Sequence, residues 1–120
     1  KFFFSNESNT KDVGNLNNTL FASIGQSSDT FGYSSGGYSP PKINNIDKFP
    51  FAADGSATDV GNLAVSVSTA AGQSSSGSGY TSGGDPIIDS IQKFPFATDS
   101  NATDIAELTQ CRRRVAGQQV

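Results

Sequence analysis

Hydrophobic and polar residues alternate along two aligned stretches, residues 43–51 (INNIDKFPF) and residues 87–96 (IIDSIQKFPF). A period of two places successive side chains on opposite faces of a strand, so each stretch predicts a half-buried β-strand. Pro50 and Pro95 fit at a strand end, an edge or a bulge, because proline cannot donate a ladder hydrogen bond. The pattern therefore predicts β-structure over both stretches.

Turn-forming residues follow each predicted strand. Residues 54–59 (DGSATD) and 99–104 (DSNATD) carry Asp, Asn, Ser and Gly, whose conformational freedom or side-chain hydrogen bonds favour tight turns. Residues 60–73 and 105–118 come next, and each segment predicts two short strands or one bent strand. One unit then comprises four short extended pieces separated by turns.

A glycine pair ends the remaining predicted strand of each unit. The segments are residues 31–37 (FGYSSGG) and 78–84 (SGYTSGG). Adjacent glycines allow a close approach of two backbones or a positive φ, so we expect one or both at these positions.

A helix over residues 102–115 is the competing prediction. Thr103 or Asp104 could cap it, with Glu107 in the first turn. The aligned segment, residues 57–71, contains Gly61 and several β-branched residues, which are poor helix formers. Because aligned copies should share one structure, strands are favoured in both places.

The same sequence pattern occurs three times. Residues 1–37 align without a gap to residues 48–84 with 17 of 37 identical, and residues 48–75 align to 93–120 with 13 of 28 identical. This alignment divides a single β-repeat domain into a degenerate unit at 1–47, a second unit at 48–92 and a partial third unit at 93–120. The first unit begins in the middle of a repeat and without Met, so the chain is interpreted as a fragment or a processed product.

The composition fits short strands. Hydrophobic residues make up 34%, with nine Phe, three Tyr, no Trp and no Met. A net charge of −3 predicts no nucleic-acid partner. The basic cluster, Arg112, Arg113 and Arg114, is either a solvated face or chain-end feature, or a site for a partner or phosphate group.

Residues needed for several chemistries are missing from the sequence. Cys111 is the single cysteine and there is no His, which excludes an internal disulfide, a zinc site and histidine acid–base catalysis. We expect Cys111 to be a thiol on a strand, and we expect no enzyme activity and no cofactor. No apolar run reaches the roughly 20 residues of a membrane span, and no signal segment is visible.

The order of these elements resembles the kelch-type blade of a β-propeller, a four-stranded antiparallel sheet. The similarity is carried by GYTSGG (79–84), the following strand and aromatic turn in residues 88–108, and RRRVAGQQ (112–119). The resemblance implies an all-β fold of kelch-like blades, here a partial propeller or fragment, since closure needs about four blades. The chain departs from the family in lacking the usual Trp and Tyr-Asp pair.

The sequence motifs KFPFA…NATD, AGQSS and GY-x-SGG are also similar to repeat arrays in predicted tail-fibre or other virion proteins of marine bacteriophages. This resemblance implies a non-enzymatic structural and recognition module with a virion or extracellular location. Its expected partners are other virion or fibre proteins, a homo-oligomer or the rest of a larger chain, and a cell-surface glycan. The alternative is an extracellular fibre or adhesin of cellular origin.

The kelch fold also includes two other functional classes. Copper-radical oxidases need His ligands that this chain lacks, and the acidic surface of this chain fits a cytosolic adaptor poorly.

Two binding hypotheses concern turn aspartates and tyrosines. A weak calcium site, as an alternative to side-chain-capped turns, would use Asp54, Asp59, Asp99 and Asp104. Tyr33 and Tyr80, beside Ser and Gly, could line a sugar-binding face, or could instead fill the space between neighbouring blades.

Six phenylalanines recur in register and are expected in the core between blades: Phe2, Phe4, Phe49, Phe51, Phe94 and Phe96. Asn6, Asn17 and Asn101 begin N-x-S/T triplets, which occur by chance in such a composition or mark glycosylation.

Overall fold

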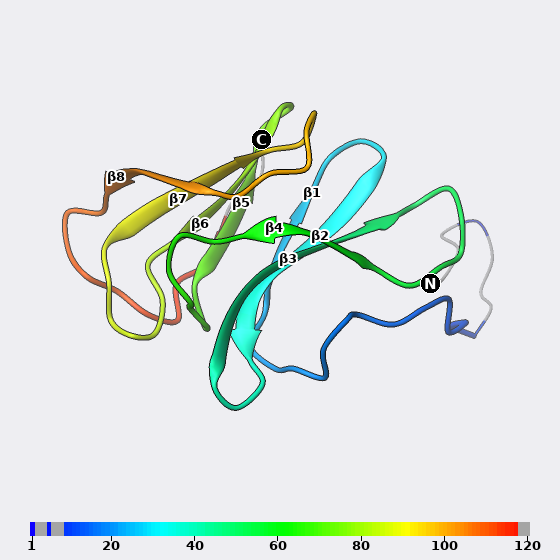
Figure 1. The fold of residues 1–120 in the computed structure, drawn as a ribbon, viewed down its shortest axis with the longest axis horizontal. Coiled ribbons are helices and arrows are strands. Elements are labelled where there is room, and N and C mark those ends of the chain that lie inside the picture. The colour runs from blue at the N-terminus through cyan, green and yellow to red at the C-terminus, as the bar shows by residue number, and fades with distance from the viewer. Residues whose placement is uncertain (2–4, 6–8, 118–120) are drawn as a thin grey trace.

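The protein consists of two antiparallel β-sheets (Figure 1). The computed structural model describes residues 1, 5 and 9–117. The first sheet contains β1 (Ile24–Ser27), β2 (Phe31–Tyr38), β3 (Lys42–Pro50) and β4 (Thr58–Asn62). The second contains β5 (Ala71–Ser74), β6 (Ser78–Ser82), β7 (Ser90–Pro95) and β8 (Thr103–Glu107). Within the described residues there is no helix, so the all-β prediction is confirmed.

Both sheets have the same strand order and the same register. Each is a meander in which consecutive strands pair, in the orders β1-β2-β3-β4 and β5-β6-β7-β8. Tyr33 lies opposite Lys48 in the first sheet, and the aligned Tyr80 lies opposite Lys93 in the second. A register shift also recurs, after Ile46 in β3 and after the aligned Ile91 in β7. The aligned sequences therefore form equivalent sheets.

The predicted strands agree with the structure over most of their length. The alternating stretches form β3 and β7, which end at Pro50 and Pro95, where a missing amide hydrogen is tolerated. The two segments after the turns begin as β4 and β8, with Thr58 and Thr103 already in the strand. Residues 63–70 then form a connection before β5, and no strand follows β8 among residues 108–117. The helix over residues 102–115 does not form.

The expectation of a strand thiol is wrong for Cys111, which is exposed on the irregular segment after β8. The aligned residue of the preceding unit is Ser66, which also lies outside the strands, in the connection between β4 and β5. The chain there passes from the last strand of one unit toward the first strand of the next, so it does not pair in a ladder.

The glycine pairs have the backbone conformation expected of them. Gly36 and Gly37 have φ values of 59° and 119°, and Gly83 and Gly84 have 63° and 120°. The Gly37 amide donates to the Val67 carbonyl at 2.8 Å, and the Gly84 amide donates to the aligned carbonyl of Arg112 at 2.7 Å. Each pair thus receives the connection that leads into the following unit, where a side chain would obstruct the approach.

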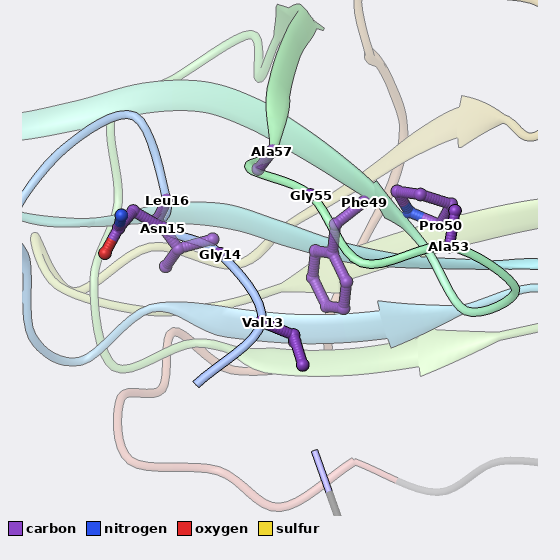
Figure 2. Close-up of a pocket in the computed structure, with 9 residues that line it drawn as sticks. All are labelled: Val13, Gly14, Asn15, Leu16, Phe49, Pro50, Ala53, Gly55 and Ala57. Carbon is purple, nitrogen blue, oxygen red and sulfur yellow. The ribbon is translucent and has the colours of Figure 1, made fainter. Parts of the chain in front are cut away.

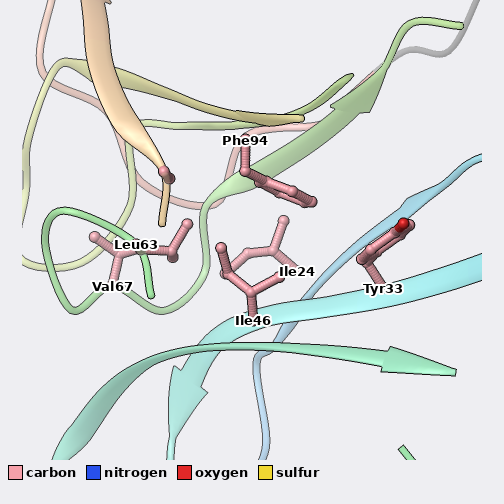
Figure 3. Close-up of a cluster of buried hydrophobic side chains, with 7 residues drawn as sticks. Ile24, Tyr33, Ile46, Leu63, Val67 and Phe94 are labelled. Atoms are coloured by element: carbon pink, nitrogen blue, oxygen red, sulfur yellow. The ribbon is translucent and has the colours of Figure 1, made fainter. Parts of the chain in front are cut away.

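The hydrophobic core lies between the two sheets (Figure 3). Ile24, Tyr33 and Ile46 come from the first sheet, and Phe94 comes from the second. Leu63 and Val67 join them from the connection between the sheets. Each sheet therefore buries apolar side chains mainly against its neighbour, which makes the contact between the sheets the main stabilising feature of the chain.

Candidate functional site

The contact between the sheets is built around Tyr33. Its ring stacks on Phe96, with centroids 4.8 Å apart and planes at 20°, and lies 5.5 Å from Phe94 at 58°. Tyr33 is 4% exposed and Phe94 is 1% exposed. Such aromatic pairs contribute about 0.5–1.5 kcal/mol beyond the burial of area. We call this contact the closed interface.

A buried polar cluster joins the same two sheets beside the rings. The Gln26 side-chain amide donates to Ser35 Oγ at 2.8 Å within its own sheet, and across the interface to Thr81 Oγ1 at 2.9 Å and the Tyr80 carbonyl at 3.1 Å. The aligned Gln73 donates to Ser82 Oγ at 3.0 Å within the second sheet. Buried hydrogen bonds of this kind require a defined geometry, so they fix how the sheets meet.

The opposite side of the first sheet carries the aligned phenylalanines, Phe49 and Phe51, in different surroundings. Phe51 is 45% exposed and Phe49 is half-buried. Their rings are 6.2 Å apart at 76°, close to the 5.8 Å and 77° of Phe94 and Phe96. The pair keeps its internal geometry, therefore, although no tyrosine among the described residues stacks on it.

A pocket of about 170 Å³ lies beside this pair (Figure 2). The Phe49 ring points into it toward Val13, which comes from the N-terminal segment. A second space of about 430 Å³ adjoins it and is bordered by Phe51. The lining is mainly apolar and includes Val13, Gly14, Leu16, Phe49, Pro50 and Ala57. We call this region the open pocket.

The N-terminal segment reproduces part of the closed interface. The Ala57 amide donates to the Asn15 carbonyl at 2.9 Å, just as the Ala102 amide donates to the aligned Asn62 carbonyl at 2.8 Å. The Lys1 ammonium lies 3.3 Å from Asp54, where the aligned pair, Lys48 and Asp99, is 2.6 Å apart.

Lys1 and Lys11 also exchange backbone hydrogen bonds of 2.8 Å in each direction. The same register is found between Lys48 and Thr58 in the first sheet. Residues 1 and 11–15 thus lie against the first sheet as parts of β3 and β4 lie against the second.

Tyr33 and Tyr80, the predicted sugar-binding residues, have different surroundings. For Tyr33 that hypothesis is wrong, because a ring with 4% exposure between two phenylalanines is unavailable to a ligand. Burial also raises the pKa of the Tyr33 phenol, since the phenolate would be poorly solvated, although the nearby Lys48 opposes this shift. The Tyr80 ring is half-buried, with the Lys93 ammonium 5.9 Å from its centroid. Tyr80 stays a predicted binding residue.

The six phenylalanines expected between blades also differ in burial. Phe94 is fully buried and Phe96 is half-buried against Tyr33. The core prediction is wrong for Phe51, because the unit on that side provides no tyrosine among the described residues to cover it. Phe2 and Phe4 lie outside the described residues.

The arginine cluster lies on the exposed segment after β8. Arg112 uses its backbone to bond Ile88 and Gly84, and its guanidinium donates to Gln110 at 2.9 Å. The Arg113 guanidinium lies 3.7 Å from Asp85, and the Arg114 amide donates to the Thr69 carbonyl. The backbone of this cluster extends the packing of the units, and its exposed side chains stay a predicted partner site.

Three of the four aspartates of the calcium hypothesis have protein partners. Asp54 pairs with Lys11 and Lys1, and Asp99 pairs with Lys48. Asp59 accepts a hydrogen bond from Asn45 at 2.6 Å. Throughout residues 1, 5 and 9–117, no group of three or more His, Cys, Asp or Glu side chains gathers that could hold a metal ion. The lysine ammonium groups therefore neutralise Asp54 and Asp99 without a metal ion.

Two aspartates have depressed pKa values. Hydrogen bonds from Lys11 and Lys1 hold the pKa of Asp54 below its ordinary value of 3.8, and the same contact raises the pKa of Lys11. A hydrogen bond from Lys42, aided by Arg113, lowers the pKa of Asp85. In each case the cation stabilises the carboxylate form.

The sequons lie in polar loops where the structure describes them. The Asn17 amide donates to Asp47 at 2.8 Å, and Asn101 Oδ1 accepts the Asn62 amide at 3.0 Å. Asn6 lies outside the described residues. Both described asparagines are exposed, so glycosylation there stays a prediction.

Sequence reasoning missed two parts of the site. One is the polar cluster of Gln26 and Thr81, whose only signal was the glutamine repeated as Gly-Gln-Ser in the aligned units. The other is the open pocket, whose apolar residues Val13 and Leu16 also recur in register. The alignment identified these positions as equivalent, but it did not predict in which repeat unit the side chains would be buried by a neighbouring unit.

Two further findings bear on identity. In the part of the chain that the structure describes, no helix has the length and apolar character required to cross a membrane. In comparisons with known families and with curated proteins, no family model and no curated protein matches this chain. The interpretation of function therefore rests on the repeat geometry and on the sequence resemblance described above.

Proposed function

We propose that this chain is a non-enzymatic structural and recognition module of a bacteriophage virion appendage, built from kelch-like β-propeller blades. In this proposal each four-stranded sheet is one blade, and blades are held side by side through their aromatic pairs. The exposed turns at the rim contact a host surface or other virion proteins.

The observation that carries the structural part is the recurrence of the same contacts from unit to unit. Backbone bonds join Ala22 to Thr69 and the aligned Thr69 to Arg114, at 3.1 and 2.8 Å. All three residues have a positive φ, between 54° and 56°. Repeat proteins gain stability from such nearest-neighbour contacts, because one unit alone buries little surface. A load-carrying or display role needs this regularity and no reaction chemistry.

The recognition part is supported by the turns at the sheet ends. Residues 51–56 and 97–101 are exposed and rich in Ala, Asp, Ser, Asn and Gly. They follow aligned strands but differ in sequence, as expected of surface loops on a shared scaffold. Small polar residues near the half-buried Tyr80 suit adaptable contacts with a glycan. The virion assignment itself rests on the resemblance to phage arrays.

The alternative is an extracellular fibre or adhesin subunit of cellular origin. It is favoured by the exposure of Asn17 and Asn101, each in an N-x-S/T triplet. Intact-mass spectrometry of material from the natural source separates the two proposals. Glycans on these residues would support the adhesin, and an unmodified chain would support the virion component.

The test of the main proposal is quantitative mass spectrometry of purified phage particles from the source. We expect peptides of this chain at a fixed ratio of several copies per particle, retained after nuclease and high-salt washing. A chain found only in host cytosol, and absent from the particles, would overturn the proposal.

A further inference from the structure

We propose that the open pocket binds a tyrosine presented by a β-hairpin of a further repeat unit, equivalent to β1 and β2 of this chain. The inference rests on the stacked-repeat part of the proposed function and is independent of the virion location. The occupant is a partner segment of defined chemistry: an extended hairpin with tyrosine between small Gly and Ser residues.

The closed interface defines what covers a phenylalanine pair. Two parts of the first sheet contact the second sheet at and just after Phe94 and Phe96. One part is the β1–β2 hairpin, which provides Ile24 and Tyr33. The other is the β3–β4 side, which provides Lys48 for Asp99 and Asn62 for Ala102. The hairpin thus covers the rings, and the β3–β4 side contacts the turn that follows them.

At the open pocket the second of these parts is already in place. Lys1 and Asn15 make the contacts with Asp54 and Ala57 that Lys48 and Asn62 make in the closed interface. The Asn15 amide also donates to Ser56 Oγ at 3.3 Å, where the aligned Asn62 amide bonds Asn101. Among the described residues, no counterpart of the β1–β2 hairpin lies there. A complete second sheet would overlap the N-terminal segment, so a hairpin fits better than a whole blade.

The size and polarity of the pocket suit one aromatic ring. A cavity of roughly 150 Å³ lined by apolar side chains accommodates benzene. The open pocket offers at least this much room, about 170 Å³ beside Phe49 and about 430 Å³ in the adjoining space beside Phe51. Its lining is mostly hydrocarbon, and both lysines beside it are paired with Asp54. A neutral ring is therefore favoured over an anion. Phe49 and Phe51 have the edge-to-face arrangement that holds Tyr33 at the closed interface.

The test is a titration of the isotope-labelled full chain with a cyclised peptide of residues 24–38, followed by NMR. Cyclisation is needed because an isolated two-stranded hairpin is only marginally stable in water. We expect saturable shifts of the Val13 and Leu16 methyl signals. Replacing Tyr33 of the peptide by alanine should lower its affinity at least tenfold.

Matched variants of the protein locate the binding. Phe51→Ala should lower peptide affinity at least tenfold, and its 45% exposure makes the variant compatible with folding. Ile87→Ala removes an apolar side chain that is 54% exposed and does not line the pocket, so affinity should be unchanged. The methyl signals of Ile24 and Ile46, in the core between the sheets, should keep their wild-type positions in each variant.

Three outcomes would overturn the inference. One is the lack of shifts at the pocket at millimolar peptide. Another is shifts at Ile24 and Ile46, which would mean that the peptide replaces the native hairpin in the closed interface. The third is self-association of the protein alone that Phe51→Ala abolishes and Tyr80→Ala leaves unchanged, which would mean that a second copy covers the pocket without a tyrosine hairpin. None of these outcomes bears on particle location, so the virion proposal is tested separately.

Discussion

The two phenylalanine pairs have the same local sequence, KFPFA, but different surroundings. Phe94 is 1% exposed beneath Tyr33, whereas the aligned Phe49 is half-buried. Phe51 is 45% exposed beside the open pocket, whereas the aligned Phe96 is half-buried against Tyr33. The strands that carry them, β7 and β3, have the same register and the same bulge. Local structure is therefore equal in the two places, and burial depends on whether the neighbouring unit provides a tyrosine hairpin. The burial of a phenylalanine pair therefore depends on the neighbouring unit and not on its own sheet.

The largest expected effect separates the two pairs directly. Phe94→Ala should lower the free energy of unfolding by about 3–5 kcal/mol, because it removes a fully buried ring and leaves a cavity. Phe49→Ala, at the aligned position, should cost less than half as much, since its ring is only half-buried. Urea unfolding followed by far-UV circular dichroism measures both. Equal losses would mean that the sheets do not differ in packing.

A second comparison concerns β1 and β5, the first strands of the two sheets. A methyl group at Gly72 would overlap the Gly25 carbonyl of the neighbouring sheet, whereas nothing lies within 4 Å of a methyl group at Gly25. Gly72→Ala should destabilise the protein by about 1–3 kcal/mol, as overpacking does. Gly25→Ala should change stability by less than about 0.5 kcal/mol. Thermal unfolding of the two variants checks the close approach, and matching midpoints would contradict it.

The polar cluster provides a third comparison. Gln26→Ala removes hydrogen bonds to Thr81 and Ser35 and leaves buried partners, which should cost about 1–3 kcal/mol. Gln73→Ala removes a bond to Ser82 within one sheet, for which about 0.5–1.5 kcal/mol is expected. Denaturant midpoints measured in parallel should rank Gln26→Ala as the less stable variant. A lower stability of Gln73→Ala would mean that the hydrogen bond within the second sheet contributes more than the bonds between the sheets, which contradicts the account.

The smallest effect is the acid sensitivity of the ion pairs beside the open pocket. Because the folded pKa of Asp54 is depressed below 3.8, its contribution to stability is present above that pH and is lost as pH falls through the folded value. Asp54→Asn should therefore be slightly less stable at neutral pH and should lose less stability on acidification. Unfolding midpoints at pH 7 and below pH 3.8 test this. A steeper acid loss in the variant would contradict the assignment.

Much of the fold followed from the sequence because the repeat could be aligned. Period-two alternation predicted β3 and β7. Gly61 and the β-branched residues of the segment aligned with residues 102–115 argued against a helix there. The glycine pairs were expected to have positive φ, and they do. These features depend on local chemistry that each copy of the repeat carries.

The remaining features depend on neighbours that a local pattern does not describe. Tyr33 and Tyr80 have nearly the same flanking residues, yet Tyr33 is buried in the closed interface and Tyr80 is half-buried. Cys111 was expected on a strand because flanking residues of its unit align with strands, but it lies in a connection. An alignment identifies equivalent positions, whereas their exposure follows from the order of units in space.

The most direct test of the account is the set of nuclear Overhauser effects from the Tyr33 ring protons in the free protein. We expect strong cross-peaks to the rings of Phe96 and Phe94, whose centroids lie 4.8 and 5.5 Å away, and none from any tyrosine ring to Phe51. Missing cross-peaks to Phe96, or equally strong cross-peaks between Phe51 and a tyrosine, would contradict the distinction between a closed interface and an open pocket.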